Sequence, residues 1–252
     1  MHQHGQSIVK NGKYKGLSLK DLWEEHRDLF GNIEGDRFPL LTKILDANQD
    51  LSVQVHPNDE YASVHENGEL GKTECWYVID STKDTEIIYG HHAETKAEFM
   101  AMIEKKEWNK LLHRVKVKPG DFFYVPSGTI HTIGKGILVL ETQQNSDTTY
   151  RLYDYDRRDS DGNSRNLHLE RSIDVIEAPF ISNQLTVKHE KVDDLSITNF
   201  IKCPYFSVEK WELDGSASLE RQKAFLLVSV IKGEGELIKE DKHYFFKKET
   251  TL

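Results

Sequence analysis

Short segments in which apolar and polar residues alternate occur along most of the chain, and turn residues separate them. Alternation with a period of two residues is typical of a strand with one buried face. The clearest segments are residues 51–56, 75–79, 122–125, 137–140 and 225–231. Turn signals such as Pro57-Asn58-Asp59 and Pro126-Ser127-Gly128 lie between them. Many short strands at such intervals predict a mainly β fold, either a barrel or a jelly roll.

Two other segments have the period of a helix. The first covers about residues 19–30 and has Ser18 at the N-cap position. The second covers about residues 96–115, where apolar residues form a stripe, and Thr95 with Glu98 matches a capping box at its start. We therefore predict two accessory helices beside the strands.

The strand pattern weakens after about residue 180. Residues 181–199 are polar and weakly patterned, and strands resume from about residue 204. We predict two domains, one over residues 1–180 with both helices and one over residues 181–252 with a connector and a second β unit. The second unit is expected to be incomplete, because a strand starts at Tyr244 and the chain ends eight residues later.

The composition fits a folded protein without a basic surface. Hydrophobic residues make up 37%, aromatic residues 10% and charged residues 30% of the 252 residues, which supplies a core and a solvated surface. The formal net charge of −9 disfavours a general nucleic-acid binder. With only two cysteines, Cys75 and Cys203, no signal peptide and no apolar run near the ~20 residues of a membrane span, we expect a cytoplasmic protein with no membrane partner.

The strand pattern also brings candidate metal ligands together. Gln54 and His56 lie two residues apart and share one face of a strand, Glu74 enters the next strand, and His131 follows a tight turn. Two imidazoles and one carboxylate form an open zinc site with a free coordination position. We predict His56, Glu74 and His131 as ligands, whereas Gln54 is the weakest candidate of the four because an amide is a poor zinc ligand and is suited to orient a neighbour. The alternative is a set of hydrogen-bonded histidines and an exposed strand carboxylate.

The segment from Gly120 to His131 carries the pattern Gly-x5-Pro-x-Gly-x2-His at every fixed position. It resembles the second cupin motif, in which a tight turn aims the histidine into the barrel. The resemblance implies a cupin-type jelly-roll barrel, followed here by a second, incomplete cupin-like β unit.

Further segments resemble successive signatures of the type I mannose-6-phosphate isomerases, in their short bacterial form. They are residues 38–46, 51–57, 71–77 and 141–151, and the resemblance extends over nearly the whole chain. It implies an aldose–ketose isomerase that interconverts mannose 6-phosphate and fructose 6-phosphate through a cis-enediolate stabilised by one zinc ion per chain. The implied partners are these sugar phosphates, in a monomer or weak homodimer.

The same resemblance implies roles for individual residues. It gives His56, Glu74 and His131 as zinc ligands and places Gln54 where longer members supply a fourth. The active-site arginine falls on Arg151, with Glu141 and Asp147 in the same motif and Lys72 beside the metal-binding glutamate. Lys72, Glu141 and Asp147 are rival bases, whereas Arg151 is suited to bind the phosphate or to steady the enediolate. The alternative for these residues is a set of structural ion pairs.

Two alternatives to the isomerase remain. Family members usually begin with strands that carry a Trp-Gly signature, and both ends of this chain resemble truncations. The first alternative is therefore a non-catalytic or impaired sugar-phosphate-binding cupin. The second is an iron or manganese cupin oxygenase, because two histidines and a carboxylate also suit those metals.

Overall fold

The computed structural model describes residues 7–220, 224–239, 242–248 and 250–251. The chain forms two compact units, one over residues 39–218 and the other from residues 1–38 together with residues 219–252. Strands predominate, so the fold is mainly β. The division into two domains near residue 180, which is based on the sequence pattern, stays a prediction.

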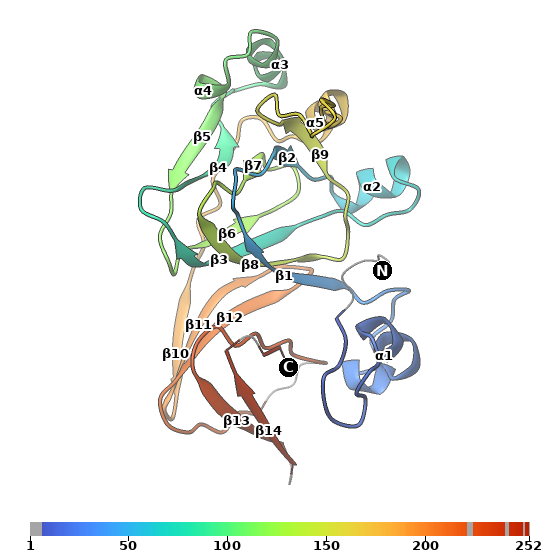
Figure 1. Ribbon diagram of the computed structural model, residues 1–252, viewed down its shortest axis with the longest axis vertical. Coiled ribbons are helices and arrows are strands. Elements are labelled where there is room, and N and C mark those ends of the chain that lie inside the picture. The colour runs from blue at the N-terminus through green and yellow to red at the C-terminus, as the bar shows by residue number, and fades with distance from the viewer. Residues whose placement is uncertain (1–6, 221–223, 240–241, 249, 252) are drawn as a thin grey trace. The chain divides into compact units, whose positions relative to one another are not determined.

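Two facing antiparallel sheets dominate the unit over residues 39–218 (Figure 1). In spatial order, the four-stranded sheet contains β1 (Leu40–Asp46), β8 (Ile137–Gln144), β3 (Glu74–Ser81) and β6 (Phe122–Val125). The five-stranded sheet contains β5 (Leu112–Lys116), β4 (Glu86–His91), β7 (His131–Thr132), β2 (Val53–Val55) and β9 (Tyr150–Tyr153). Strands that are distant in sequence thereby become neighbours.

The five-stranded sheet buries side chains on both of its faces. Its inner face packs against the four-stranded sheet, where Trp76 and Val139 meet Ile87 and Ile133. Its outer face is covered by α3 (Lys96–Glu104), α4 (Trp108–Leu111) and α5 (Leu169–Val175). The residues of β2 and β9 that face these helices are Val53, Val55, Tyr150 and Leu152. Because strand side chains alternate, Gln54 and Arg151 lie on the inner face.

The helices agree only in part with the sequence prediction. Ser18 caps α1 (Leu19–Glu25) and Thr95 caps α3, as predicted. The first helix continues as a 3-10 segment over Arg27–Phe30 after a break at His26. The helix predicted from 96 to 115 is interrupted after Glu104, where Lys106 takes a positive φ of 56°, and resumes as α4 only over Trp108–Leu111. The prediction is wrong for residues 112–115, which belong to β5. Helices α2 (Asp59–His65) and α5 were not predicted.

The remaining strands form two smaller groups. A three-stranded antiparallel sheet contains β10 (Lys188–Val192), β11 (Leu195–Lys202) and β12 (Ser207–Leu213). In the other unit, β13 (Glu234–Lys239) pairs with β14 (Lys242–Lys247) as an antiparallel hairpin. That unit also contains an aromatic cluster in which the rings of Trp23, Phe30, Phe38 and Phe225 lie 5.3–5.6 Å apart.

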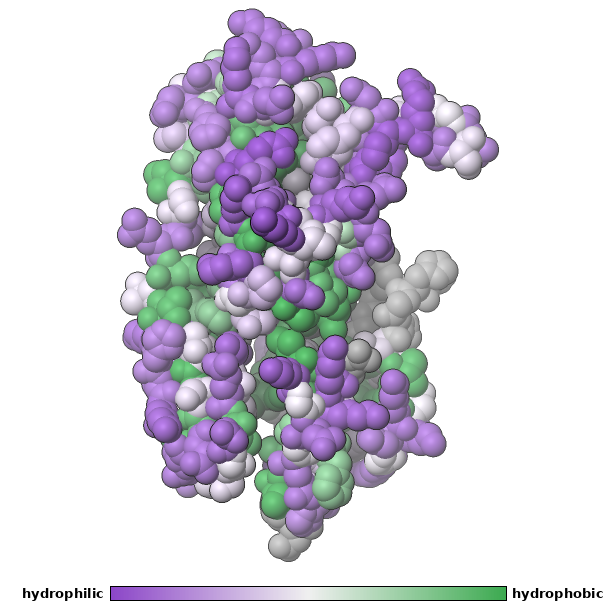
Figure 2. Space-filling model, turned by 60° about the vertical axis from the view of Figure 1, so that its left-hand side comes forward, coloured by the Kyte–Doolittle hydropathy of each residue, from purple (hydrophilic) through white to green (hydrophobic). Residues whose placement is uncertain are grey.

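Hydrophilic residues cover most of the face drawn in Figure 2, and hydrophobic residues form scattered groups between them. This distribution fits the charged fraction of the sequence. No helix in the described part of the chain has the length and apolar composition needed to cross a bilayer.

Candidate metal centre and active site

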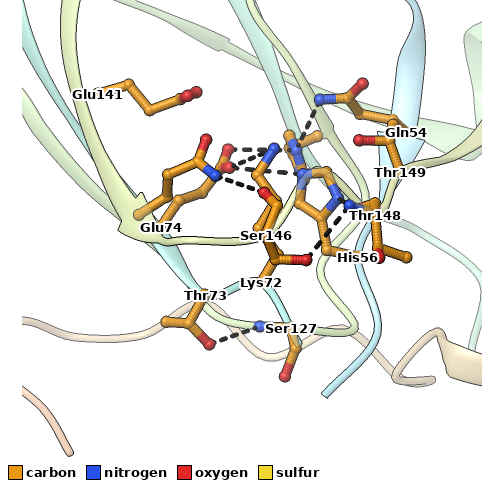
Figure 3. A network of polar contacts seen from close by, with 12 residues as sticks. Gln54, His56, Lys72, Thr73, Glu74, Ser127, Glu141, Ser146, Thr148 and Thr149 are labelled. Atoms are coloured by element: carbon orange, nitrogen blue, oxygen red, sulfur yellow. Dashed lines mark hydrogen bonds and ion pairs between the residues drawn. The ribbon is translucent and has the colours of Figure 1, made fainter. Parts of the chain in front are cut away.

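Three potential metal ligands that are distant in sequence meet between the two sheets. His56 follows β2, Glu74 begins β3 and His131 begins β7. One carboxylate oxygen of Glu74 lies 3.4 Å from Nε2 of His56, and the other lies 3.4 Å from Nε2 of His131. All three residues are buried, and Figure 3 shows His56 and Glu74 directed toward each other. One ligand atom from each residue lies within 4.8 Å of the others, so the group could hold a metal ion.

The hydrogen bonds of the two histidines leave the right atoms free for a metal. Nδ1 of His56 donates to the carbonyl of Thr148 and Nδ1 of His131 donates to the carbonyl of Thr129, each over 2.9 Å. Each Nε2 therefore keeps an unprotonated lone pair directed at Glu74. Burial lowers the pKa of His56 to about 3 and also lowers the pKa of His131, so both rings are neutral at neutral pH.

Two buried atoms of this cluster are directed into it and could bind a cation. Within the described residues, Nε2 of His56 and Oε2 of Glu74 have no hydrogen bond, and the ammonium of Lys72 lies 3.3 Å from Oε2. A buried acceptor without a donor, such as Nε2 of His56, is rare in folded proteins. Two neutral imidazoles and an ionised carboxylate also form a common donor set for zinc. The residues present therefore fit a divalent metal ion.

Glu74 is held as a carboxylate by neighbours on its own strand and the preceding turn. Nζ of Lys72 lies 3.3 Å from Oε2 of Glu74, and Nε1 of Trp76 donates to Oε1 over 3.0 Å. Burial by itself raises the pKa of Glu74, but Lys72 and the two histidines outweigh it and keep that pKa well below its usual value. Because the histidines are neutral at neutral pH, Lys72 supplies the compensating charge. Lys72 is itself 5% exposed, so the ion pair is buried.

A pocket of about 190 Å³ lies beside these residues. Its polar lining consists of Lys43, Gln54, Lys72, His131, Glu141, Asp147 and Thr149. Nε2 of Gln54 lies 3.3 Å from Nε2 of His131, and Nζ of Lys43 lies 3.1 Å from Oε1 of Glu141. Burial, followed by the charge of Glu74, raises the pKa of Glu141 against the opposing effect of the two lysines. The pocket thus combines a candidate metal centre with several groups able to move a proton.

Arg151 approaches the same region from β9 but does not line this pocket. It is the register partner of Gln54, which places both on the inner face of the five-stranded sheet. Its Nε donates to Oγ of Ser52 over 3.2 Å, and its Nη1 donates to the carbonyl of Asn166 over 3.0 Å. The guanidinium is thereby fixed at the edge of the sheet next to Gln54.

A second concavity lies away from the candidate metal ligands. A groove of about 620 Å³ is lined mainly by residues of β10, β11 and β12. It is larger than the pocket beside the histidines, but none of His56, Glu74 and His131 reaches it. Its volume alone therefore does not make it the reaction site.

The structure brings most of the predicted site residues together and adds others. Gln54, Lys72, Glu141 and Asp147 line the pocket beside the three candidate ligands, whereas Arg151 lies next to it. Two residues of the site were not predicted. Lys43 contacts both Glu141 and Gln143, and Nε1 of Trp76 donates to Glu74. The alternation in β1 places Lys43 on one face, but only the pairing with β8 shows which carboxylate it meets.

Facing antiparallel sheets with a His-Glu-His cluster between them define a cupin-type protein with a candidate metal centre. Comparisons with known proteins make the class specific. Residues 1–79 match the family described as phosphomannose isomerase type I, catalytic domain, and residues 196–250 match the one described as mannose-6-phosphate isomerase, cupin domain. The chain is 70% identical over 247 residues to mannose-6-phosphate isomerase ManA of Bacillus subtilis (strain 168), covering 98% of this chain and 78% of that protein.

Other relatives agree. The chain is 54% identical over 236 residues to a mannose-6-phosphate isomerase of Streptococcus mutans, covering 94% of this chain and 74% of that protein. A crystal structure of mannose 6-phosphate isomerase from Bacillus subtilis superimposes with a TM-score of 0.95 at 52% identity, covering 99% of this chain and 80% of that one. The chain belongs to the type I mannose-6-phosphate isomerase family. The predicted family, enzyme class and mainly β cupin fold are thereby confirmed.

Proposed function

We propose that this protein interconverts mannose 6-phosphate and fructose 6-phosphate, and its relatives carry the name mannose-6-phosphate isomerase. The observation that carries the proposal is the buried His-Glu-His cluster, which adjoins a pocket lined by lysines and carboxylates and in which Nε2 of His56 has no hydrogen bond. Moving a proton between adjacent carbons requires a base beside a group that stabilises the enediolate oxygens.

We infer that His56, Glu74 and His131 hold one zinc ion, with Gln54 as a candidate fourth ligand. Zinc suits two neutral imidazoles and a carboxylate in an open site. When bound, it would act as a Lewis acid that stabilises negative charge developing on the substrate oxygens. The carbonyls of Thr148 and Thr129 would keep both imidazoles in the tautomer that this binding needs.

The proton transfer falls to groups that line the pocket. Lys72, Glu141 and Asp147 are the candidates, and they differ in their surroundings. Lys72 already neutralises Glu74, whereas Asp147 is exposed to solvent. Glu141 is 4% exposed and its raised pKa brings it nearer to the range in which a carboxylate exchanges protons reversibly. Glu141 is therefore the base that we favour, with Lys43 holding its carboxylate in place.

Arg151 is proposed to bind the phosphate or to steady the enediolate. Its Nε and Nη1 are occupied by Ser52 and Asn166, so its planar head has a fixed direction. No protein atom of the described residues accepts a hydrogen bond from its Nη2. A fixed guanidinium at the rim of the site is suited to an anionic oxygen.

The direct test is an assay of fructose 6-phosphate formation from mannose 6-phosphate, with zinc and after chelation. We expect turnover that chelator removes and zinc restores. In the same assay, His131→Ala should lose both metal and turnover, whereas Arg151→Ala should keep its metal content and lose about 100-fold or more in kcat/KM. No turnover in folded, zinc-replete protein would refute the proposed activity and leave an impaired sugar-phosphate-binding cupin.

The oxygenase alternative is distinguished by metal analysis of the purified protein. Iron or manganese with oxygen consumption would favour it, and no contact described above does so. The cytoplasmic location and the monomeric or weakly dimeric state stay predictions, which fractionation and sedimentation would check.

A further inference from the structure

The main chain of Arg151 lies on the outer edge of β9, where no further strand follows. β9 pairs with β2 on one side only, so the edge-directed N–H and C=O of Arg151 need other partners. A single residue, His168, supplies both of them. The main-chain N–H of His168 donates to the carbonyl of Arg151 over 2.8 Å, and Nδ1 of His168 accepts from the N–H of Arg151 over 3.1 Å.

His168 occupies a helix position at which a different residue type is normally preferred. It is the N-cap residue of α5, where Ser, Thr, Asp or Asn usually accepts a hydrogen bond from the first turn. The His168 side chain makes no such bond. Its acceptor nitrogen instead accepts from the main-chain N–H of Arg151, so the ring stabilises strand β9 and does not cap α5.

The neighbouring segment also fixes the arginine side chain. The carbonyl of Asn166 accepts from Nη1 of Arg151, two residues before His168. Residues 166–168 therefore hold both the main chain and the guanidinium of Arg151. The surroundings keep the His168 ring in the accepting form, because burial and the charge of Arg151 lower its pKa. Arg171 acts in the same direction, Glu66 opposes it, and the Tyr150 ring lies 6.2 Å away.

We propose that His168 is a positioning residue for the isomerase reaction, which holds Arg151 in its working orientation through the Nδ1 acceptor. This inference rests on the proposed function, because it assumes that Arg151 acts on the substrate. His168 itself is not placed against the substrate. A small displacement of a positioned group is enough to slow an enzyme considerably.

The test compares two substitutions that differ in the acceptor alone. Oδ1 of asparagine can occupy nearly the place of Nδ1, so His168→Asn should keep the bond to Arg151 and turnover within about twofold of the parent. His168→Ala removes the acceptor, and the loss of one such hydrogen bond predicts about a tenfold fall in kcat/KM. His113→Ala is the matched control, because the His113 ring also bonds a main-chain group through Nδ1, here by donating to the carbonyl of Tyr89, away from Arg151. It should leave kcat/KM unchanged.

A double-mutant cycle separates positioning from general destabilisation. In an Arg151→Ala background, His168→Ala should cause no further loss, because the group that it positions is gone. An equal loss in both backgrounds would overturn the proposal, and so would equal defects in the Asn and Ala variants.

Amide hydrogen exchange gives a reading that does not depend on activity. The Arg151 amide should exchange at least tenfold faster in His168→Ala than in the parent, and His168→Asn should restore its protection. If the parent protein had no isomerase activity, the proposed function would fail, and this measurement would still decide whether His168 holds Arg151. Unchanged exchange in the alanine variant would refute that role.

Discussion

Replacing Lys72 by methionine should destabilise the protein strongly without metal and only slightly with it. Lys72 is 5% exposed and Glu74 is 0% exposed, and their charged atoms lie 3.3 Å apart. Removing one partner of a buried ion pair costs about 3–5 kcal/mol. We take about 3 kcal/mol, because Trp76 still donates to the carboxylate in the variant. For a protein of this size that corresponds to a fall of roughly 6–12 °C in Tm.

A bound dication changes this result because it replaces the missing positive charge. In zinc-saturated protein we expect the loss to shrink to about 1 kcal/mol, roughly 2–4 °C. By thermodynamic linkage, the difference of about 2 kcal/mol between the stability losses without and with zinc equals the change in the free energy of zinc binding. The variant should therefore bind zinc about 30-fold more tightly than the parent. The measurements are thermal unfolding with chelator and with zinc, and a competitive zinc titration. Activity is not needed for either.

The matched control is Lys110→Met, which breaks the exposed pair with Glu107. It should not change Tm measurably in either state, because exposed ion pairs contribute little. If Lys72→Met lowered Tm equally with and without zinc, and zinc affinity did not change, no metal would lie beside Glu74. That result would refute the assignment of the metal centre.

Three further predictions concern the surroundings of the site. Trp76→Phe keeps most of the ring but removes the donor to Glu74, so zinc affinity measured by competition should fall about 10- to 100-fold, and Tm of the chelated protein should also fall because a buried carboxylate loses a hydrogen bond. Gly128→Ala should cost about 2 kcal/mol in urea unfolding, because φ is +84° and the new Cβ would lie 3.0 Å from the Val175 carbonyl. Burial raises the pKa of Asp154, but hydrogen bonds from Arg165 and Arg157 outweigh it and lower that pKa below its usual value. The ionised Asp154 therefore stabilises the folded protein above pH ~4, and this stabilisation is lost as the pH falls further. Asp154→Asn should therefore cost about 2 kcal/mol at pH 7 and progressively less as the pH falls below ~4, as acid titration of unfolding would show.

The sequence was sufficient to predict those features in which a local residue pattern determines the local backbone. The turn before His131 was predicted because proline and glycine at fixed spacing restrict the backbone there, and Gly128 does adopt a positive φ. The caps at Ser18 and Thr95 were predicted for the same reason. The second helix was extended too far, because the apolar residues after Glu104 suit either a helix or a strand when only their spacing is known.

The sequence was insufficient to predict side-chain contacts that depend on the pairing of strands distant in the chain. Lys43 meets Glu141 across 98 residues of chain, and only the register of β1 with β8 brings them together. The bond from Arg151 to His168 depends on a loop that returns to the edge of β9. Such contacts follow from the tertiary arrangement, which no local periodicity encodes.

Strand β2 makes the site intolerant of changes in chain length. Val53 and Val55 face the helices, whereas Gln54 belongs to the pocket, so a one-residue insertion or deletion would exchange the two faces. Two valines would then enter the pocket, and an amide would be buried without partners among apolar side chains. β2 is hydrogen-bonded to β7 on one side and to β9 on the other, which leaves no free edge to absorb a slip. Among functional variants of this protein, substitutions in β2 should therefore occur, whereas insertions and deletions should be confined to exposed turns such as residues 158–164.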